Sequence, residues 1–269
     1  MTDFTETNLR NWEARTALHR ETYPLEKFKD GWDPLFPIEA QEIGDVSGLD
    51  VLHLQCHVGM DSLGLVRRGA TVTGVDFSPA ALEMAHELVE ETGLDARFVE
   101  ADVYDTPRRI RQKFDLVYST WGTINWLPDM MRWGKMVATM LKPGGRVYLA
   151  DGHPAMLLME EEDDRLVHQY PWRTDPGDPM RFDEEVDYTG AELPKDASAS
   201  YDWAHPLSSI IGGLIGAGLN LDFLNEHDRL PWPYANLMVE DSDEPRLYRL
   251  PAHLPAMPLS FSLQASKPA

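Results

Sequence analysis

Residues 51 to 76 place polar side chains with nucleoside-binding chemistry between two short apolar runs. The segment reads VLHLQCHVGMDSLGLVRRGATVTGVD, and its second apolar run ends on Asp76. An acid that closes the second strand of a βαβ unit can accept hydrogen bonds from ribose hydroxyls. Asp76 follows Gly59 by 17 residues, near the roughly 20 expected for such an acid. The spacing therefore predicts a nucleoside pocket.

Three elements must position that pocket. VLHL and TVTGV are short, apolar and rich in β-formers, so we expect two neighbouring parallel strands joined by the helix DSLGLVRR. In such a unit the first loop, the helix N-terminus and the end of the second strand meet at one edge of the sheet. Asp76 is then next to the loop that carries Gln55 and His57.

The composition of the loop indicates which nucleoside it binds. A dinucleotide pyrophosphate needs G-x-G-x-x-G, because bare backbone must approach the phosphates. Gln55 and His57 instead carry bulky side chains that would collide with a pyrophosphate. They could line an amino-acid tail with a carboxylate and an ammonium, as in S-adenosylmethionine (SAM), which has no phosphate. A nicotinamide dinucleotide stays the alternative that Asp76 and the βαβ unit alone would allow.

Residues 45 to 150 resemble the core of the class I SAM-dependent methyltransferases. VLHLQCHVG matches the family's V-L-D-L-G-C-G-x-G motif with three departures, in which His53 replaces the acid and Gln55 and His57 replace glycines. ARFVEADVYD, FDLVYSTWGTINWLPD and LKPGGRVYLAD resemble the later segments, in the family's order. The resemblance implies an α/β, Rossmann-like fold whose seven-stranded, mostly parallel sheet is flanked by helices and has an antiparallel last strand.

The resemblance also implies SAM as cofactor and a set of residues that contact it. Asp102 would meet the adenine amino group, while Ser119, Thr120 and Trp121 would face SAM. The cofactor contacts expected in all are Gln55, Cys56, His57, Gly59, Asp76, Phe77, Ser78, Asp102, Val103, Ser119, Thr120 and Trp121.

The rest of the chain divides around this core into one methyltransferase domain of residues 1–269. A helix over residues 5–22 has an imperfect apolar stripe of Leu9, Trp12, Ala17 and Leu18. It is either a lid over SAM or a helix packed on the sheet edge. The expected parts are an N-terminal helical lid or extension (1–44), the SAM-binding core (45–151), an acceptor-side insertion after the fifth strand (152–205), and a late helix with the final strands (206–269).

Local signals predict further element boundaries. Ser78-Pro79 and Gly93 bracket a helix. A second helix over 130–141 should stop at Pro143-Gly144-Gly145. Residues 23–37 read as a loop and residues 160–200 as an irregular insertion, because neither has clear periodicity. The last elements are a glycine-rich helix over 205–218 and strands over 221–230 and 258–266.

Methyl transfer from SAM is an SN2 displacement, in which positioning supplies much of the rate. A base is needed only where the acceptor O, N or C atom must lose a proton. Histidine suits that role because its pKa lies near neutrality. His153 and His205 are the catalytic candidates, although each could instead cap a loop or bind a carbonyl.

Aromatic and amide side chains near the fourth strand and in the insertion could wall the acceptor. These candidates are Trp121, Asn125, Trp172 and Tyr201. The alternative for the aromatic residues is that they pack the loops. A third possibility for the whole chain is a methyltransferase-like module that binds SAM without catalysis, suggested by the three motif departures.

Charge and composition limit the partners. With 24 basic and 45 acidic side chains the net charge is −21, which disfavours nucleic-acid and anionic-membrane acceptors. Solubility alone would also explain this charge, and a small cationic or neutral acceptor would suit it. The lone Cys56 leaves no disulfide framework or cysteine-rich zinc site, and no metal is expected. Without a long apolar run or a signal-like start, the chain is expected to be cytoplasmic, with a homodimer left open.

Overall fold

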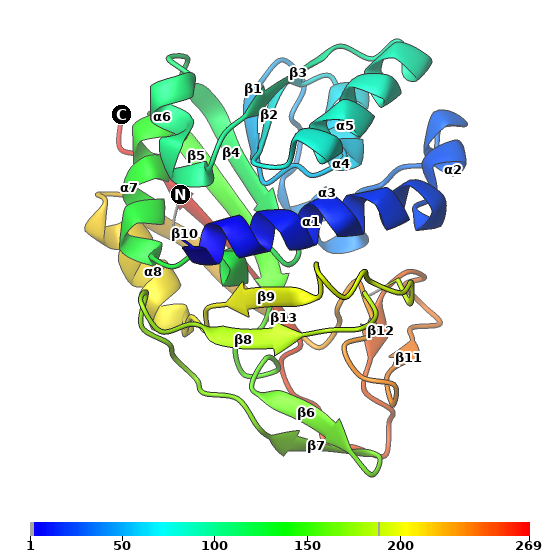
Figure 1. Ribbon diagram of the computed structural model, residues 1–269. Coiled ribbons are helices and arrows are strands. Elements are labelled where there is room, and N and C mark those ends of the chain that lie inside the picture. The colour runs from blue at the N-terminus through cyan, green and yellow to red at the C-terminus, as the bar shows by residue number, and fades with distance from the viewer. Residues whose placement is uncertain (1–2, 188) are drawn as a thin grey trace.

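A seven-stranded sheet forms the centre of the computed structural model, which describes residues 3–187 and 189–269 (Figure 1). The strand order is β10-β13-β5-β4-β1-β2-β3. Neighbours from β5 to β3 are parallel, whereas β13 is antiparallel to both β5 and β10. The predicted fold class is confirmed. The strands are β1 (Asp50–Leu54), β2 (Thr71–Asp76), β3 (Ala96–Glu100), β4 (Phe114–Thr120), β5 (Leu141–Gly152), β10 (Asn220–His227) and β13 (Ser260–Ser266).

Helices cover both faces of this sheet because its central strands are apolar on both sides. Along β1, Val51 packs with α3 (Pro37–Glu42) and α4 (Met60–Arg67), while Leu52 and Leu54 pack with α7 (Met130–Met140) and α8 (Leu207–Gly216). The other helical segments are α1 (Asp3–Thr22), α2 (Leu25–Lys29), α5 (Pro79–Thr92), η1 (Val103–Asp105), α6 (Thr106–Arg109) and η2 (Ile124–Trp126).

The predicted cap signals delimit α5. The Ser78 side chain accepts a hydrogen bond from the Ala81 N–H, and Gly93 ends the helix with a left-handed φ of 67°. The helix predicted over 130–141 is present as α7. It ends at Met140, just before Pro143-Gly144-Gly145 as predicted, but these three residues lie within β5, which begins directly at Leu141. A register shift between β4 and β5 accommodates them.

The glycines of α8 allow it to approach α7 closely. A Cβ atom on Gly213 would lie 2.3 Å from the Met130 carbonyl oxygen, and one on Gly134 would lie 2.2 Å from the Gly213 oxygen. No side chain fits at these points. The glycine-rich interior of the predicted helix is therefore a requirement of packing.

The buried face of α1 differs from the predicted one. Its buried residues are polar, whereas Leu9, Trp12 and Leu18 are only partly buried and Ala17 is exposed. The apolar stripe was a wrong guide because α1 lies against the backbone of an insertion hairpin, which needs hydrogen-bonding partners. The predicted loop over 23–37 is also too simple, since α2 lies within it. The buried residues of α1 are Asn8, Asn11, Arg15, Thr16 and His19.

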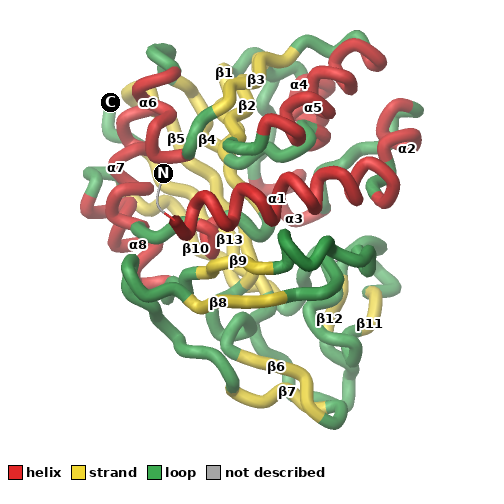
Figure 2. Tube along the Cα trace, in the orientation of Figure 1, coloured by secondary structure: helices red, strands yellow, loops and turns green. Residues whose placement is uncertain are grey.

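The insertion is not irregular. It forms two antiparallel hairpins, one of which lies along α1 in both views of the chain (Figures 1 and 2). Asp163 and Asp164 turn the first hairpin with φ angles of 49° and 58°, as a primed two-residue turn requires. The hairpins and a later strand pair are β6 (Met159–Glu162) with β7 (Arg165–His168), β8 (Met180–Asp183) with β9 (Ala199–Asp202), and β11 (Val239–Glu240) with β12 (Tyr248–Arg249).

Within residues 3–187 and 189–269, no helix is both long enough and apolar enough to cross a membrane.

Candidate functional site

A cavity of about 1430 Å³ lies at the carboxyl ends of β1, β2 and β4. Gln55, Asp76 and Thr120 line it from the ends of these strands. Side chains from α1 and from the insertion close its other sides. The site thus lies where an open α/β sheet binds its ligands.

The loop after β1 follows a backbone path that normally requires glycine. Gln55, His57 and Gly59 have φ angles of 52°, 50° and 77°. Left-handed backbone is costly for residues with a side chain and concentrates at functional sites. Gly59 cannot be replaced, because a Cβ atom there would lie 2.7 Å from the Phe98 ring. The loop therefore keeps the glycine-type path while adding two polar side chains to the cavity wall.

Gln55 presents a hydrogen-bond acceptor at this wall. Its Nε2 donates to the Thr123 carbonyl oxygen at 2.9 Å. Its Oε1 is covered and has no protein partner among the described residues. A buried acceptor without a partner is costly, so this atom favours a ligand that brings a donor.

Asp76 connects the loop to the next helix. Its Oδ2 accepts the His57 N–H at 2.8 Å, and its Oδ1 accepts the Ser78 N–H at 2.9 Å. Burial raises the pKa of this carboxyl to about 6, although the backbone N–H groups of Ser78, His57 and Phe77 oppose the rise. Each carboxylate oxygen has two lone pairs. Asp76 can therefore accept from two further hydroxyls while it holds the loop.

Asp102 and Val103 extend the cavity beyond β3. Asp102 Oδ1 caps η1 by accepting the Tyr104 N–H at 2.8 Å. Val103 is buried, and Phe77 lines the same region. An apolar slot with a carboxylate at its edge suits a planar ring that bears an amino group.

Asp151, at the end of β5, fixes the loop that follows β4. Its carboxylate accepts backbone N–H groups of Gly122 at 2.7 Å, Thr123 at 2.9 Å and Ile124 at 3.2 Å. Burial raises its pKa, against the effect of these donors. Trp121 precedes them with a left-handed φ of 57°. Asp151 was not among the predicted residues, although an acid at a strand end is the same signal that identified Asp76.

Helix α1 covers the cofactor loop with an aromatic side chain. The Trp12 ring lies 5.2 Å from the His57 ring and 5.2 Å from the Trp126 ring, between centroids. The next residue, Glu13, accepts a hydrogen bond from the Ser78 hydroxyl. These contacts place α1 over the site, as the lid interpretation expects, and also tie it to the start of α5.

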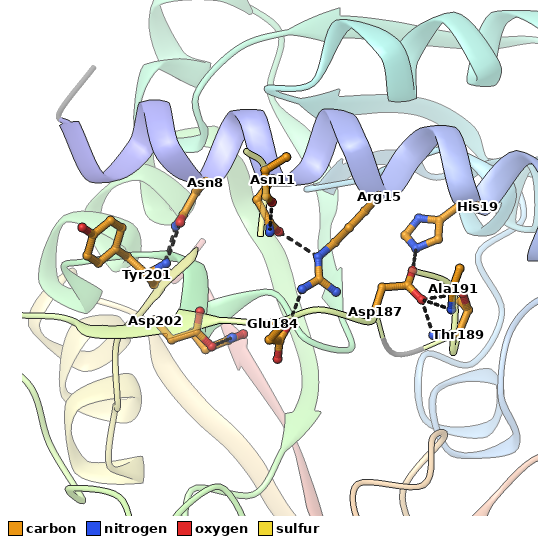
Figure 3. Close-up of polar contacts among 12 residues, drawn as sticks. Asn8, Asn11, Arg15, His19, Glu184, Asp187, Thr189, Ala191, Tyr201 and Asp202 are labelled. Atoms are coloured by element: carbon orange, nitrogen blue, oxygen red, sulfur yellow. Dashed lines mark hydrogen bonds and ion pairs between the residues drawn. The ribbon is translucent and has the colours of Figure 1, made fainter. Parts of the chain in front are cut away.

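Buried polar contacts join α1 to the β8–β9 hairpin, and we call them the polar seam (Figure 3). Asn8 and Tyr201 exchange two hydrogen bonds, between the Asn8 amide and the Tyr201 backbone, at 2.7 and 2.8 Å. Asn11 donates to the Ala197 carbonyl oxygen at 2.8 Å and accepts from Arg15 Nε at 2.7 Å. Arg15 also forms an ion pair with Glu184. The seam consists of Asn8, Asn11, Arg15 and His19 with their partners in residues 184–201.

His19 connects the seam to the cofactor loop. Its Nε2 lies 2.9 Å from Asp187 Oδ2 and its Nδ1 lies 3.2 Å from His57 Nε2. Since a carboxylate only accepts, Nε2 carries the hydrogen, and Nδ1 accepts from His57. Burial lowers the pKa of His19 to about 4 and that of His57 to about 3, despite Asp187 in the first case. Both rings are neutral at pH 7.

The insertion supplies a wall of rings and carboxylates. The Trp121 and Trp232 rings, which follow β4 and β10 and are not part of the insertion, lie 6.3 Å apart. Within the insertion, the Tyr170 and Phe182 rings lie 5.5 Å apart. Asp202 lies on the same wall, where its Oδ2 accepts from Asn125 Nδ2 at 2.8 Å. Its Oδ1 is covered and, among the described residues, has no hydrogen-bond partner.

Most of the predicted site residues lie around this cavity, and five do not. Gly59 and Ser119 lie beneath it, Ser78 caps α5, and Tyr201 joins the seam through its backbone. His153, the fifth, is discussed below. The predicted residues that line the cavity are Gln55, Cys56, His57, Asp76, Phe77, Asp102, Val103, Thr120, Trp121, Asn125, Trp172 and His205.

The two candidate bases have partners in the protein. His153 does not line the cavity, and its Nε2 lies 2.9 Å from Glu226 Oε1 on β10. His205 does line it, but its Nε2 lies 2.6 Å from the Leu127 carbonyl oxygen. Burial lowers the pKa of both rings. His205 therefore binds a backbone carbonyl, which was the alternative to a catalytic role.

Apart from Trp172, sequence reasoning missed the cavity residues that come from α1, from the insertion and from the segment after β10. No sequence signal marks Arg15, Glu184, Asp202 or Trp232, because they lie far from the core motifs and in no recognisable register. Only their long-range contacts show that they belong to the site.

Comparison with known proteins identifies the central part of the chain. Residues 51–145 match a family model described as "Methyltransferase domain". A ubiquinone biosynthesis O-methyltransferase of Photorhabdus laumondii is 30% identical over 110 residues, which are 41% of this chain and 45% of that protein. Its counterpart in Coxiella burnetii is 30% identical over 105 residues, 39% and 44% of the two chains. The match thus spans less than half of each relative.

Solved structures share the fold over a longer stretch. A SAM-dependent methyltransferase from Mesorhizobium loti has a TM-score of 0.58 at 19% identity, covering 89% of this chain and all of that one (100%). The glycopeptide N-methyltransferase MtfA, in complex with SAM, has a TM-score of 0.55 at 15% identity, with 86% and 87% coverage. At these identities the likeness concerns the fold.

Proposed function

We propose that this chain, whose residues 51–145 match a family model described as "Methyltransferase domain", is a SAM-dependent enzyme of the class I methyltransferase family that methylates a small-molecule acceptor. The observation that carries the proposal is the loop of Gln55, His57 and Gly59, left-handed at all three glycine positions and held by Asp76. The family match, the sheet order and the cavity at the strand ends support it.

The residues of the cavity fit SAM. Asp76 has free lone pairs for two ribose hydroxyls, and Asp102 borders an apolar slot for adenine. The unpartnered Gln55 Oε1 can accept from the methionine ammonium. This acceptor compensates for His53, a neutral ring in the motif's acid position, whose pKa burial lowers to about 3. When bound, SAM supplies an electrophilic methyl group.

The rest of the chain orients the acceptor and excludes water. Asp151 holds the loop with Trp121 and Asn125 in one position, and α1 with the hairpin closes the site. Well-oriented reactants reach effective molarities of about 10⁵ M or more. Positioning by these elements can therefore supply much of the rate.

A nicotinamide dinucleotide fits this loop less well. Its pyrophosphate must approach bare backbone at a helix N-terminus. Here the side chains of Gln55 and His57 line the cavity at two of the positions that the approach would need. The oxidoreductase alternative thus has only Asp76 and the βαβ unit in its favour.

The relatives named above methylate oxygen or nitrogen according to their descriptions, so the acceptor atom of this chain is open at the level of family. Five further expectations stay predictions from the sequence: a single domain, a cytoplasmic location, no nucleic-acid acceptor, no membrane partner, and a homodimer as a possible assembly.

Isothermal titration calorimetry tests the proposal. We expect wild-type protein to bind SAM and its demethylated product, S-adenosylhomocysteine (SAH), and to show no comparable heat with NADH. Binding of NADH alone would establish the oxidoreductase alternative. If the protein binds SAM but forms no SAH with any member of a broad acceptor panel, it is a non-catalytic module.

A further inference from the structure

We propose that the acceptor is a small organic amine that enters protonated, and that Asp202 is the residue that holds it and takes its proton. This inference rests on the function proposed above and specifies the acceptor for the same site. It depends on the side of the cavity that α1 and the insertion form, which the family match of residues 51–145 does not include.

Asp202 lines the cavity, and only one of its two carboxylate oxygens accepts a hydrogen bond from a described residue. Asn125 Nδ2 donates to Oδ2 at 2.8 Å, and the Trp203 N–H donates to the Asn125 carbonyl oxygen at 2.7 Å. These two bonds fix β9 against the loop after β4, where the acceptor of a methyl group enters. Oδ1 is covered and has no partner within the described part of the chain. A buried carboxylate oxygen in this state favours a ligand with an N–H or O–H donor.

The charge of the surrounding wall selects a cation. Ten carboxylates and four guanidinium groups are among the described residues that line the cavity. Arg15, the guanidinium nearest the insertion side, forms an ion pair with Glu184. Arg246 stacks over the Trp32 and Phe36 rings at 4.8 and 5.0 Å, and its guanidinium donates to the Pro34 and Leu35 carbonyl oxygens. Arg108 pairs with Asp105, and Arg132 lies over the Tyr104 ring. Each guanidinium among the described lining residues is thus already engaged, which disfavours an anionic acceptor.

Aromatic rings complete the environment of an ammonium group. Tyr170 and Phe182 line the cavity with Asp202, because Phe182 lies on β8, the strand paired with β9, and the Tyr170 ring lies 5.5 Å from the Phe182 ring. A cation near the face of such rings is attracted by the ring quadrupole, more strongly when it is desolvated. A carboxylate opposed by rings is thus a site for an organic ammonium rather than for a neutral alcohol.

The environment also favours the proton transfer that methylation requires. Burial raises the pKa of Asp202 to about 7, and the nearby charge of Glu184 adds to this rise. The hydrogen bond from Asn125 and the charge of Arg15 oppose it. The Tyr234 hydroxyl is the other titratable group that interacts with Asp202. Burial disfavours the ammonium as well. An ion pair of Asp202 with R–NH₃⁺ can therefore convert to the neutral acid and R–NH₂.

The steps balance in atoms and charge. One proton moves from the ammonium nitrogen to Asp202 Oδ1, and the freed lone pair attacks the methyl carbon. The C–S bond breaks as the N–C bond forms, so the positive charge moves from sulfur to the methylated ammonium. Asp202 then returns its proton to solvent when the product leaves.

The test uses full-length protein with two primary arylalkylamines that carry no hydroxyl group, 2-phenylethylamine and tryptamine, and two oxygen acceptors, catechol and 4-hydroxybenzoate. SAH formation is measured for each. We expect methylation of an amine and little turnover of the oxygen acceptors. Methylation of catechol or 4-hydroxybenzoate without any amine, or failure of both amines to react and to bind the SAH complex, would overturn the inference.

Asp202→Asn and a matched control assign the role of the carboxylate. Asp183→Asn changes an exposed acid on the same hairpin that pairs with Arg181 and does not line the cavity. We expect Asp202→Asn to keep its melting temperature and SAH affinity but to lose about 100-fold or more in kcat/KM for the amine. The wild-type rise of kcat/KM through about pH 7 should disappear with it.

Asp183→Asn should match wild type in every readout. Wild-type kcat/KM in Asp202→Asn, or an unchanged pH profile, would contradict the role of Asp202. Failure of the wild-type protein to bind SAM and SAH would instead remove the proposed function itself, so the two failures are distinguishable.

Discussion

The two sides of the cavity are built in different ways. The cofactor side comes from consecutive strands and loops of residues 51–151, and its key acids, Asp76 and Asp151, hold backbone N–H groups. The acceptor side joins α1 to the insertion through side-chain contacts across 168 to 193 residues of sequence. A nucleoside pocket can thus follow from local pattern, whereas an acceptor pocket depends on pairs that only the folded chain brings together.

The largest expected effect concerns Asp76. Asp76→Ala removes the carboxylate proposed to accept from both ribose hydroxyls, each bond to a charged group being worth about 1.5 kcal/mol or more. We expect SAH affinity to fall by about 100-fold, measured by calorimetry. Asp129→Ala is the matched control, because Asp129 also accepts two backbone N–H groups but lies outside the cavity lining. Equal SAH affinity in Asp76→Ala and wild type would refute the assignment.

The close packing of α7 against α8 should be sensitive to a single added methyl group. In Gly213→Ala the new Cβ atom would lie 2.3 Å from the Met130 carbonyl oxygen, whereas Gly212→Ala meets nothing within 4 Å. We expect Gly213→Ala to lower the free energy of unfolding by about 1–3 kcal/mol, and Gly212→Ala to raise it by about 0.5–1 kcal/mol. Urea unfolding of both variants measures this. Equal effects would show that α7 and α8 do not approach as closely as described.

Asn11→Ala tests whether the polar seam belongs to the acceptor side alone. The change leaves the Ala197 carbonyl oxygen and Arg15 Nε without their Asn11 partner, so we expect a loss of about 1–2 kcal/mol in unfolding free energy. SAH affinity should stay within about twofold, since no bond to the cofactor loop is removed. Arg10→Ala, on the exposed side of the same helix, should change neither. A large loss of SAH affinity in Asn11→Ala would show that the two sides are not separable.

The smallest effect is a pH dependence of stability. His19 has a pKa of about 4 in the folded protein, against 6.5 for an ordinary histidine, so between these values only the unfolded chain binds the proton. Stability due to neutral His19 is complete above pH 6.5 and decreases as pH falls toward 4. Raised carboxyl pKa values act in the opposite direction, but they are common to wild type and His19→Gln. We expect the difference in unfolding free energy between the two proteins to shrink as pH falls, and a constant difference would contradict the seam's description.

The sequence predicted the parts of the fold that local pattern controls. The strands around Gln55 and Asp76 and the caps of α5 follow from short-range signals and are present as expected. The hairpins of the insertion were not foreseen, because β6 reads MEEE and alternates little between apolar and polar residues. The prediction of which face of α1 is buried was wrong for a related reason. Asn11 is buried only because Ala197 and Arg15 satisfy it, and nothing near residue 11 in sequence indicates this.

A crystal structure of the wild-type protein soaked with SAH would test the central claim most directly. We expect the ribose hydroxyls at Asp76, the adenine amino group beside Asp102, and the amino-acid tail along Gln55, with the sulfur facing the wall that carries Asp202. Density for SAH elsewhere on the molecule, or a ribose that makes no contact with Asp76, would contradict the placement of the cofactor.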